Sequence, residues 1–73
     1  MGTAGAPAGS APVNVNQAGP DELDALPGVG PATAQAIISE REANGPFASV
    51  DDLLRVRGIG DAKLAAMREL VVV

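Results

Sequence analysis

Apolar residues recur three or four positions apart from Leu23 onward, the spacing that places side chains on one face of an amphipathic helix. Prolines and glycines interrupt this pattern at intervals, so the helices that it predicts are short. We expect four of them, running from Pro20 to the Pro27-Gly28 stop, from Pro31 to Asn44, from Ser49 to Val56 and from Asp61 to Leu70.

The boundaries of these helices carry residues that favour them. Pro20 suits a first helical position, where a missing N–H costs nothing, and the acids that follow it suit the helix dipole. The second helix ends at Asn44 to Pro46, where the glycine supplies a left-handed cap. Ser49 followed by Asp52 resembles a capping box, with Asp in place of the usual Glu or Gln, and opens the third helix.

The helical pattern is duplicated along the chain. Shifting the first half by thirty positions superposes acids, leucines, glycines and alanines on their equivalents in the second half. Two short helices are too few to fold alone, so units at about 18–45 and 48–73 are expected to share one core in an all-α domain. The matched pairs are Asp21 with Asp51, Leu23 with Leu53, Gly28 with Gly58, Gly30 with Gly60, Ala32 with Ala62 and Ala36 with Ala66.

The predicted core combines one apolar stripe from each helix with the residues between the paired glycines, Val29 and Ile59. Phe47, the only aromatic residue, is expected to fill the core between the units. Val13 to Asn16 alternates like a strand and Val71 to Val73 is β-branched, which predicts a short two-stranded clip. The other expected core residues are Leu23, Leu26, Ala34, Ile37, Ile38, Leu53, Val56, Leu64, Met67 and Leu70.

The composition excludes several classes of function. The chain has 73 residues and contains no Cys, His, Trp or Tyr. A Ser-His or Cys-His catalytic pair is therefore impossible, no thiolate can hold a metal, and most base-stacking platforms are missing. No carboxylates stand in the paired surroundings that acid–base catalysis needs. We expect one small domain that is not an enzyme and carries no cofactor.

The formal net charge of −4 argues against a polyanionic partner, but the charges are unevenly distributed. Residues 1–45 hold five acids and one base, Arg41, which lies between two glutamates and is expected to serve the structure. Residues 46–73 hold four acids and four bases, and Arg55, Arg57 and Lys63 gather around the second glycine turn. Charge alone leaves the partner undecided.

Residues 1–12, "MGTAGAPAGSAP", have the composition of a flexible linker. They predict that the natural protein extends further in the N-terminal direction, with a frayed terminus as the alternative. No stretch of the sequence is long and apolar enough to span a membrane, and no secretory signal is recognisable.

Two glycine turns, "LPGVG" at Leu26 to Gly30 and "VRGIG" at Val56 to Gly60, carry the candidate chemistry. Each joins two predicted helices, so the first amides of the second helix lack an acceptor and lie at the positive end of its dipole. Phosphate is a common occupant of such a position. Neither turn has the longer span that a nucleotide loop requires. A tight helical hairpin without a ligand is the alternative, but duplication favours a polymer with repeating phosphates.

"LPGVGPATAQAI" and "VRGIGDAKLAAM" resemble helix-hairpin-helix motifs, and "NGPFASVDDL" between them is more specific. From Val13 to about Val73 the chain resembles the C-terminal domain of the ComEA family, the membrane-anchored DNA receptors of bacterial competence. The resemblance implies a SAM-like tandem fold that binds double-stranded DNA without sequence preference, through amides and phosphates along the minor groove. It also implies an N-terminal anchor and a place outside the cytoplasmic membrane.

The resemblance places the contacts at matching positions of the two turns. Arg57 and Lys63 adjoin the second turn, whereas the first has no base, so the second is expected to dominate binding. Asp61 departs from what a phosphate site favours. The expected DNA-binding residues are Gly28, Val29, Gly30, Thr33, Arg57, Gly58, Ile59, Gly60 and Lys63. Related hairpins also hold a monovalent cation on turn carbonyls, here those of Leu26, Val29, Val56 and Ile59.

A protein-binding or structural module of the same fold is the alternative function, because the extrinsic photosystem II protein PsbU has this type of domain. The acidic first unit favours this alternative, whereas Arg57 and Lys63 favour DNA. A fragment of a repair protein or ligase is a third interpretation, against which the "NGPF" segment and the linker argue. No small-molecule substrate is expected, and other partners in DNA uptake are not predicted.

Overall fold

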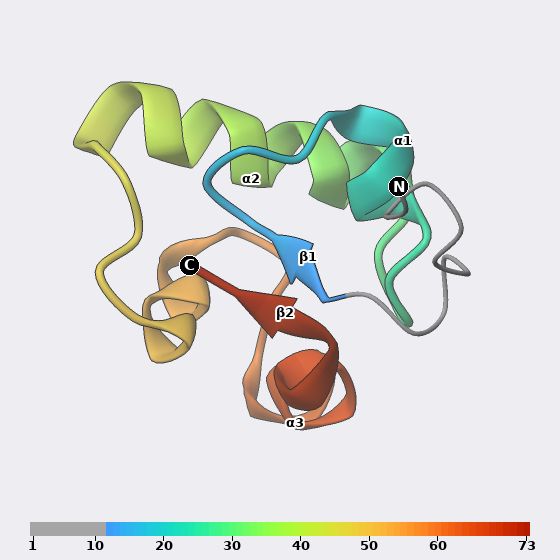
Figure 1. Ribbon diagram of the computed structural model, residues 1–73. Coiled ribbons are helices and arrows are strands. Elements are labelled where there is room, and N and C mark those ends of the chain that lie inside the picture. The colour runs from blue at the N-terminus through green and yellow to red at the C-terminus, as the bar shows by residue number, and fades with distance from the viewer. Residues whose placement is uncertain (1–11) are drawn as a thin grey trace, which may run out of the picture.

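The computed structural model describes residues 12–73, so the linker predicted over residues 1–12 lies outside the described residues except for Pro12. Figure 1 shows α2 across the top with α1 against one end of it, α3 at the bottom, and the two strands between them. The elements in order are β1 (Val13–Asn14), α1 (Pro20–Asp24), α2 (Pro31–Asn44), the 3₁₀ helix η2 (Val50–Arg55), α3 (Asp61–Met67), the 3₁₀ turn η3 (Arg68–Leu70) and β2 (Val71–Val72).

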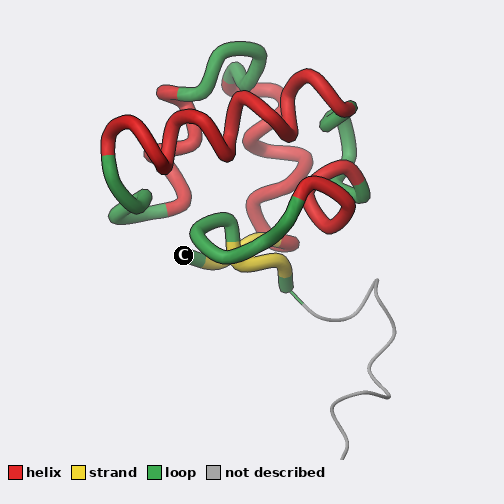
Figure 2. Tube along the Cα trace, turned by 90° about the horizontal axis from the view of Figure 1, so that it is seen from above, coloured by secondary structure: helices red, strands yellow, loops and turns green. Residues whose placement is uncertain are grey.

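The two ends of the domain are joined by the strands. β1 and β2 pair in parallel, with Val13 opposite Val71 and Asn14 opposite Val72. The amide of Val15 extends the pairing by donating to the carbonyl of Val72 at 2.9 Å. Figure 2 shows the strands side by side beneath the helices. The helical fold and the short clip predicted from the sequence are therefore confirmed.

Both units bury an apolar side chain at every third position. Leu23, Leu26 and Val29 are buried in the first, and Leu53, Val56 and Ile59 in the second. Each set follows successive hydrogen bonds between residues three apart, from Leu26 to Leu23, from Val29 to Leu26, from Val56 to Leu53 and from Ile59 to Val56. Side chains three positions apart lie on the same face of such turns. Each series of hydrogen bonds therefore places its three apolar side chains in the shared core.

Two details of the predicted helices, the capping box at Ser49 and the burial of Leu70, are wrong. The segment after Ser49 is a 3₁₀ helix, and Ser49 makes no side-chain cap. The carboxylate of Asp52 accepts instead from the amide of Ala48 at 3.0 Å, so a capping box does not form. Leu70, expected in the core, is 39% exposed. The change from α3 to η3 at Met67 turns it outward, and Val71 takes the buried position.

The sequence pattern missed the segment that precedes α1. Val15 is completely buried and Ala18 is 3% exposed, although neither belongs to a helical stripe. The guanidinium Nη1 of Arg41 donates to the carbonyls of both residues, at 2.9 and 2.7 Å. The structural role predicted for Arg41 is thus confirmed, with backbone acceptors in place of its neighbouring glutamates.

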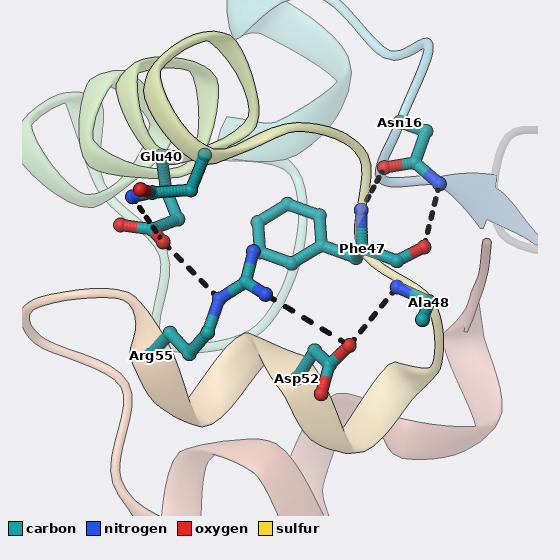
Figure 3. A network of polar contacts seen from close by, with 7 residues as sticks. Asn16, Glu40, Phe47, Ala48, Asp52 and Arg55 are labelled. Atoms are coloured by element: carbon teal, nitrogen blue, oxygen red, sulfur yellow. Dashed lines mark hydrogen bonds and ion pairs between the residues drawn. The ribbon is translucent and has the colours of Figure 1, made fainter.

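Phe47 lies in the core between the units, as predicted, and is 2% exposed. Figure 3 shows the side chain of Asn16 pairing with its backbone, accepting from the amide at 2.7 Å and donating to the carbonyl at 3.1 Å. The guanidinium carbon of Arg55 lies 5.1 Å from the centre of the ring. Arg55 also pairs with Glu40 of α2 at 3.1 Å, so this cluster ties η2 to the first unit.

None of the helices between residues 12 and 73 combines the length and the apolar character that crossing a membrane requires. Over the same residues, every buried side-chain nitrogen or oxygen has a hydrogen-bond partner.

Candidate nucleic-acid interface

The two glycine turns have the same backbone geometry, which extends the duplication from sequence to structure. Gly28 and Gly58 have positive φ angles of 78° and 96°, a conformation that favours glycine. Gly30 and Gly60 are extended, with φ angles of −101° and −106°, and cap α2 and α3 respectively. The first glycine of each pair is therefore required by the turn, whereas the second is not.

Each turn leaves a row of backbone amides without an acceptor. The first bond within α2 runs from Ala34 to the carbonyl of Gly30, and the first within α3 from Leu64 to that of Gly60, both at 2.9 Å. Among residues 12–73, no backbone carbonyl accepts from Gly28, Gly30, Ala32 or Thr33, or from Gly58, Gly60, Ala62 or Lys63. These donors include the amides of six residues in the predicted contact set, namely Gly28, Gly30, Thr33, Gly58, Gly60 and Lys63. The amides of Ala32 and Ala62 were missed, although the rule that a first helical turn has free donors could have found them.

Val29 and Ile59, the residues between the paired glycines, anchor the two turns in the core. Each is 5% exposed, and their amides donate to the carbonyls of Leu26 and Val56 at 3.1 Å. Neither the side chain nor the amide of these two residues is open to a ligand, although both were in the predicted contact set.

The carbonyls of Leu26 and Val56, two of the four proposed as cation ligands, already accept these turn bonds. Between residues 12 and 73, no group of three or more His, Cys, Asp or Glu side chains is arranged to hold a metal ion. The monovalent cation stays a prediction of the resemblance.

The second glycine of each turn faces open space. Apart from the glycine itself and its two neighbours in the chain, no atom of residues 12–73 would lie within 4 Å of a Cβ atom added to Gly30 or Gly60. Ser, Thr, Asp or Asn would cap the following helix better than glycine does. Neither conformation nor packing explains glycine at these positions, and its effect is to leave the adjacent amides uncovered.

The side chains that follow the turns cross between the units. A Cβ atom at Gly28 would lie 3.4 to 3.6 Å from Cγ, Cδ and Cε of Lys63, so the lysine stem lies along the first turn. Reciprocally, a Cβ atom at Gly58 would lie 3.3 Å from Oγ1 of Thr33. Lys63 and Thr33 are equivalent in the repeat, so the two turns form one continuous surface. The sequence had assigned each residue to its own turn.

Two bases have no ion pair or hydrogen bond within residues 12–73, and both are in the predicted contact set. Arg57 and Lys63 are exposed. Arg55 pairs with Glu40 and Asp52, and Arg68 pairs with Asp51. Two cations thus stand beside the open amides, together with the exposed carboxylate of Asp61.

The model of the helix-hairpin-helix motif family matches residues 9–72. ComE operon protein 1 of Bacillus subtilis is 41% identical over 61 residues, which cover 84% of this chain and 30% of that protein. Endonuclease/exonuclease/phosphatase family domain-containing protein 1 of Danio rerio is 43% identical over 56 residues, or 77% of this chain and 10% of that protein. An uncharacterized protein of Haemophilus influenzae is 38% identical over 61 residues, covering 82% of this chain and 54% of that protein. The chain therefore spans about half or less of each of these relatives.

Proposed function

The chain belongs to the helix-hairpin-helix family, and from this premise we propose that it binds double-stranded DNA without sequence preference. The backbone amides of the two glycine turns donate to phosphate oxygens, and Arg57 and Lys63 supply the positive charge. Contacts to phosphate carry no base information, so binding of this kind is independent of sequence. The domain acts as a binder, with no catalytic step of its own.

One observation carries the proposal: Gly30 and Gly60 are glycines that neither the fold nor the packing requires. A side chain at either position would stand in front of the open amides. Both positions lack a side chain, and a ligand whose own backbone comes close to the protein at these amides explains this absence. DNA carries phosphates at regular intervals, so two equivalent glycine turns can each bind one phosphate of the same molecule.

The resemblance to the ComEA family and the 41% identity with ComE operon protein 1 support a role in DNA uptake. We infer that the domain meets incoming DNA outside the cytoplasmic membrane. Because the two turns lie on one surface, both can contact the same duplex, and we propose that they do so along its minor groove.

The test is a set of three glycine substitutions with a labelled random-sequence duplex at low and moderate salt. Gly30→Val and Gly60→Val should each weaken binding by roughly tenfold or more, because the amides lose their charge-assisted hydrogen bonds. Gly19→Val is the matched control. Gly19 also caps a helix and has an extended φ of −86°, and an added Cβ would meet no atom within 4 Å apart from its chain neighbours, but it lies outside the turns.

All three variants should fold, with a similar cost of about 1 kcal/mol for a poor N-cap. Equal losses of affinity in all three would place the contact elsewhere. No binding by the unsubstituted domain, even at low salt, would exclude the DNA function.

The second candidate function is a protein-binding or structural module. The observation that favours it is electrostatic: the net charge is −4, and among the described residues only Arg57 and Lys63 are bases without an acidic or carbonyl partner. Failure to bind the duplex at low salt would leave this candidate in place.

A further inference from the structure

We propose that Lys63 neutralises the phosphate held at the first glycine turn, Leu26 to Gly30, and not the one at its own turn. Arg57 then serves the second turn, Val56 to Gly60, so that each half of the site has one cation. This inference rests on the proposed DNA binding and states how charge is divided within that site.

The path of the lysine side chain carries the inference. Cγ, Cδ and Cε of Lys63 lie 3.4, 3.5 and 3.6 Å from the place of a Cβ atom at Gly28. Three successive carbons therefore run along the first turn, and the ammonium group continues from that stem. These separations correspond to van der Waals contact, so the lysine stem packs on the turn at position 28, where the positive φ of 78° favours glycine. An apolar stem that packs on protein while its charged end stays in solvent is the usual arrangement of lysine.

The equivalent residue of the first unit makes the reciprocal crossing. Oγ1 of Thr33 lies 3.3 Å from the place of a Cβ atom at Gly58, in the second turn. Two equivalent residues that each reach the opposite turn indicate that the crossing belongs to the arrangement of the units, and is not the choice of one flexible side chain. The hydroxyl of Thr33 accordingly supplements the second turn, beside Arg57.

This division of charge changes the expectation from the sequence that the second turn dominates the binding of DNA. By position in the chain, both free bases adjoin the second turn, and the first turn has none. In three dimensions the first turn gains Lys63 and the second keeps Arg57. Each turn therefore has one base, and neither dominates the binding of DNA.

The test combines charge-removing substitutions with blockage of one turn at a time. Lys63→Met keeps an apolar stem against Gly28 but removes the ammonium group, and Arg57→Met is the matched change at the second turn. Each is introduced into the unsubstituted domain, into Gly30→Val and into Gly60→Val. Binding of a labelled random-sequence duplex is then titrated at several low salt concentrations, with chemical shifts of the open amides as a second readout.

Lys63→Met should lower the affinity roughly two- to fivefold in the unsubstituted and Gly60→Val domains. It should have no effect in Gly30→Val, where the first turn is already blocked, because the two losses are then coupled. Arg57→Met should show the opposite pattern, with its effect lost in Gly60→Val. The salt dependence should change by about one unit wherever the affinity changes.

An effect of Lys63→Met that persists in Gly30→Val and disappears in Gly60→Val would overturn the crossed assignment and leave the DNA function intact. Equal effects in both backgrounds would also overturn it, since the lysine would then serve neither turn in particular. A domain that fails to bind the duplex before any substitution would overturn the proposed function and this inference with it.

Discussion

Arg41 holds the irregular segment between β1 and α1 against α2 through a single nitrogen. Its Nη1 donates to the carbonyls of Val15 and Ala18, which are 26 and 23 positions away in the chain. The acceptors are otherwise open carbonyls of a turn, and a charged donor bonds them more strongly than a neutral one. The first residues of the domain therefore depend on a side chain from the middle of it.

We expect Arg41→Met to destabilise the domain by about 2 to 3 kcal/mol, because two charge-assisted hydrogen bonds are lost and their acceptors stay partly buried. Urea denaturation measures this loss, and Arg41→Lys, which keeps the charge without the planar donor group, should lose less. The affinity of the folded variant for duplex DNA should not change. A weaker affinity at unchanged stability would make Arg41 a DNA contact.

The burial of a single residue could be predicted from the sequence where it depends on the chemistry of that residue alone. Phe47 could be placed in the core because a lone aromatic residue seldom stays exposed in a small domain. The acceptors of Arg41 could not be found, because they follow no pattern along the sequence. The crossing of Lys63 to Gly28 was equally hidden, since it depends on how one unit packs on the other.

Among the elements, α2 was predicted best because both its ends are marked. Pro31 begins it, and Gly45, with a φ of 87°, follows its last residue. The segment of η2 was expected as a helix but not as a 3₁₀ helix, because Leu53 and Val56 share a face in either form. The same ambiguity misplaced Leu70, where the chain changes from one helical period to the other.

The turns themselves give a prediction that separates their two glycines. Gly58→Ala should lower the free energy of unfolding by about 1 to 2 kcal/mol, because an L-residue is strained at a φ of 96° and its Cβ would approach Thr33. Gly60→Ala should cost less than about 1 kcal/mol, since its backbone is extended and its surroundings are open.

Thermal unfolding should therefore differ between the two alanine variants by several degrees, as about 1 kcal/mol shifts the midpoint of a domain this small by about 4 to 8 °C. Equal midpoints would contradict the division of the turn into a conformational and an open glycine. The same comparison at Gly28 and Gly30 repeats the test in the first unit.

At the scale of the whole domain, residues 12–73, the two units share one core, and only two of the bases, Arg57 and Lys63, have no ion pair or hydrogen bond. Arg55 links Glu40 of the first unit to Asp52 of the second, and its guanidinium covers the ring of Phe47. The pairing that stabilises the contact between the units thus occupies a base that would otherwise be free to bind a ligand. A net charge of −4 and a function in binding DNA are compatible only if the free cations lie at the turns.

This distribution sets the salt dependence of DNA binding. Each phosphate neutralised contributes about −0.9 to the slope of log K against log salt, so Arg57 and Lys63 together predict a slope of about −2. Arg68→Met, which removes a base already paired with Asp51, should leave the slope unchanged, whereas Lys63→Met should bring it close to −1. A slope of about −4 would mean that the paired arginines leave their acids to contact DNA, and the ion pairs seen within and between the units would then be features of the free domain alone.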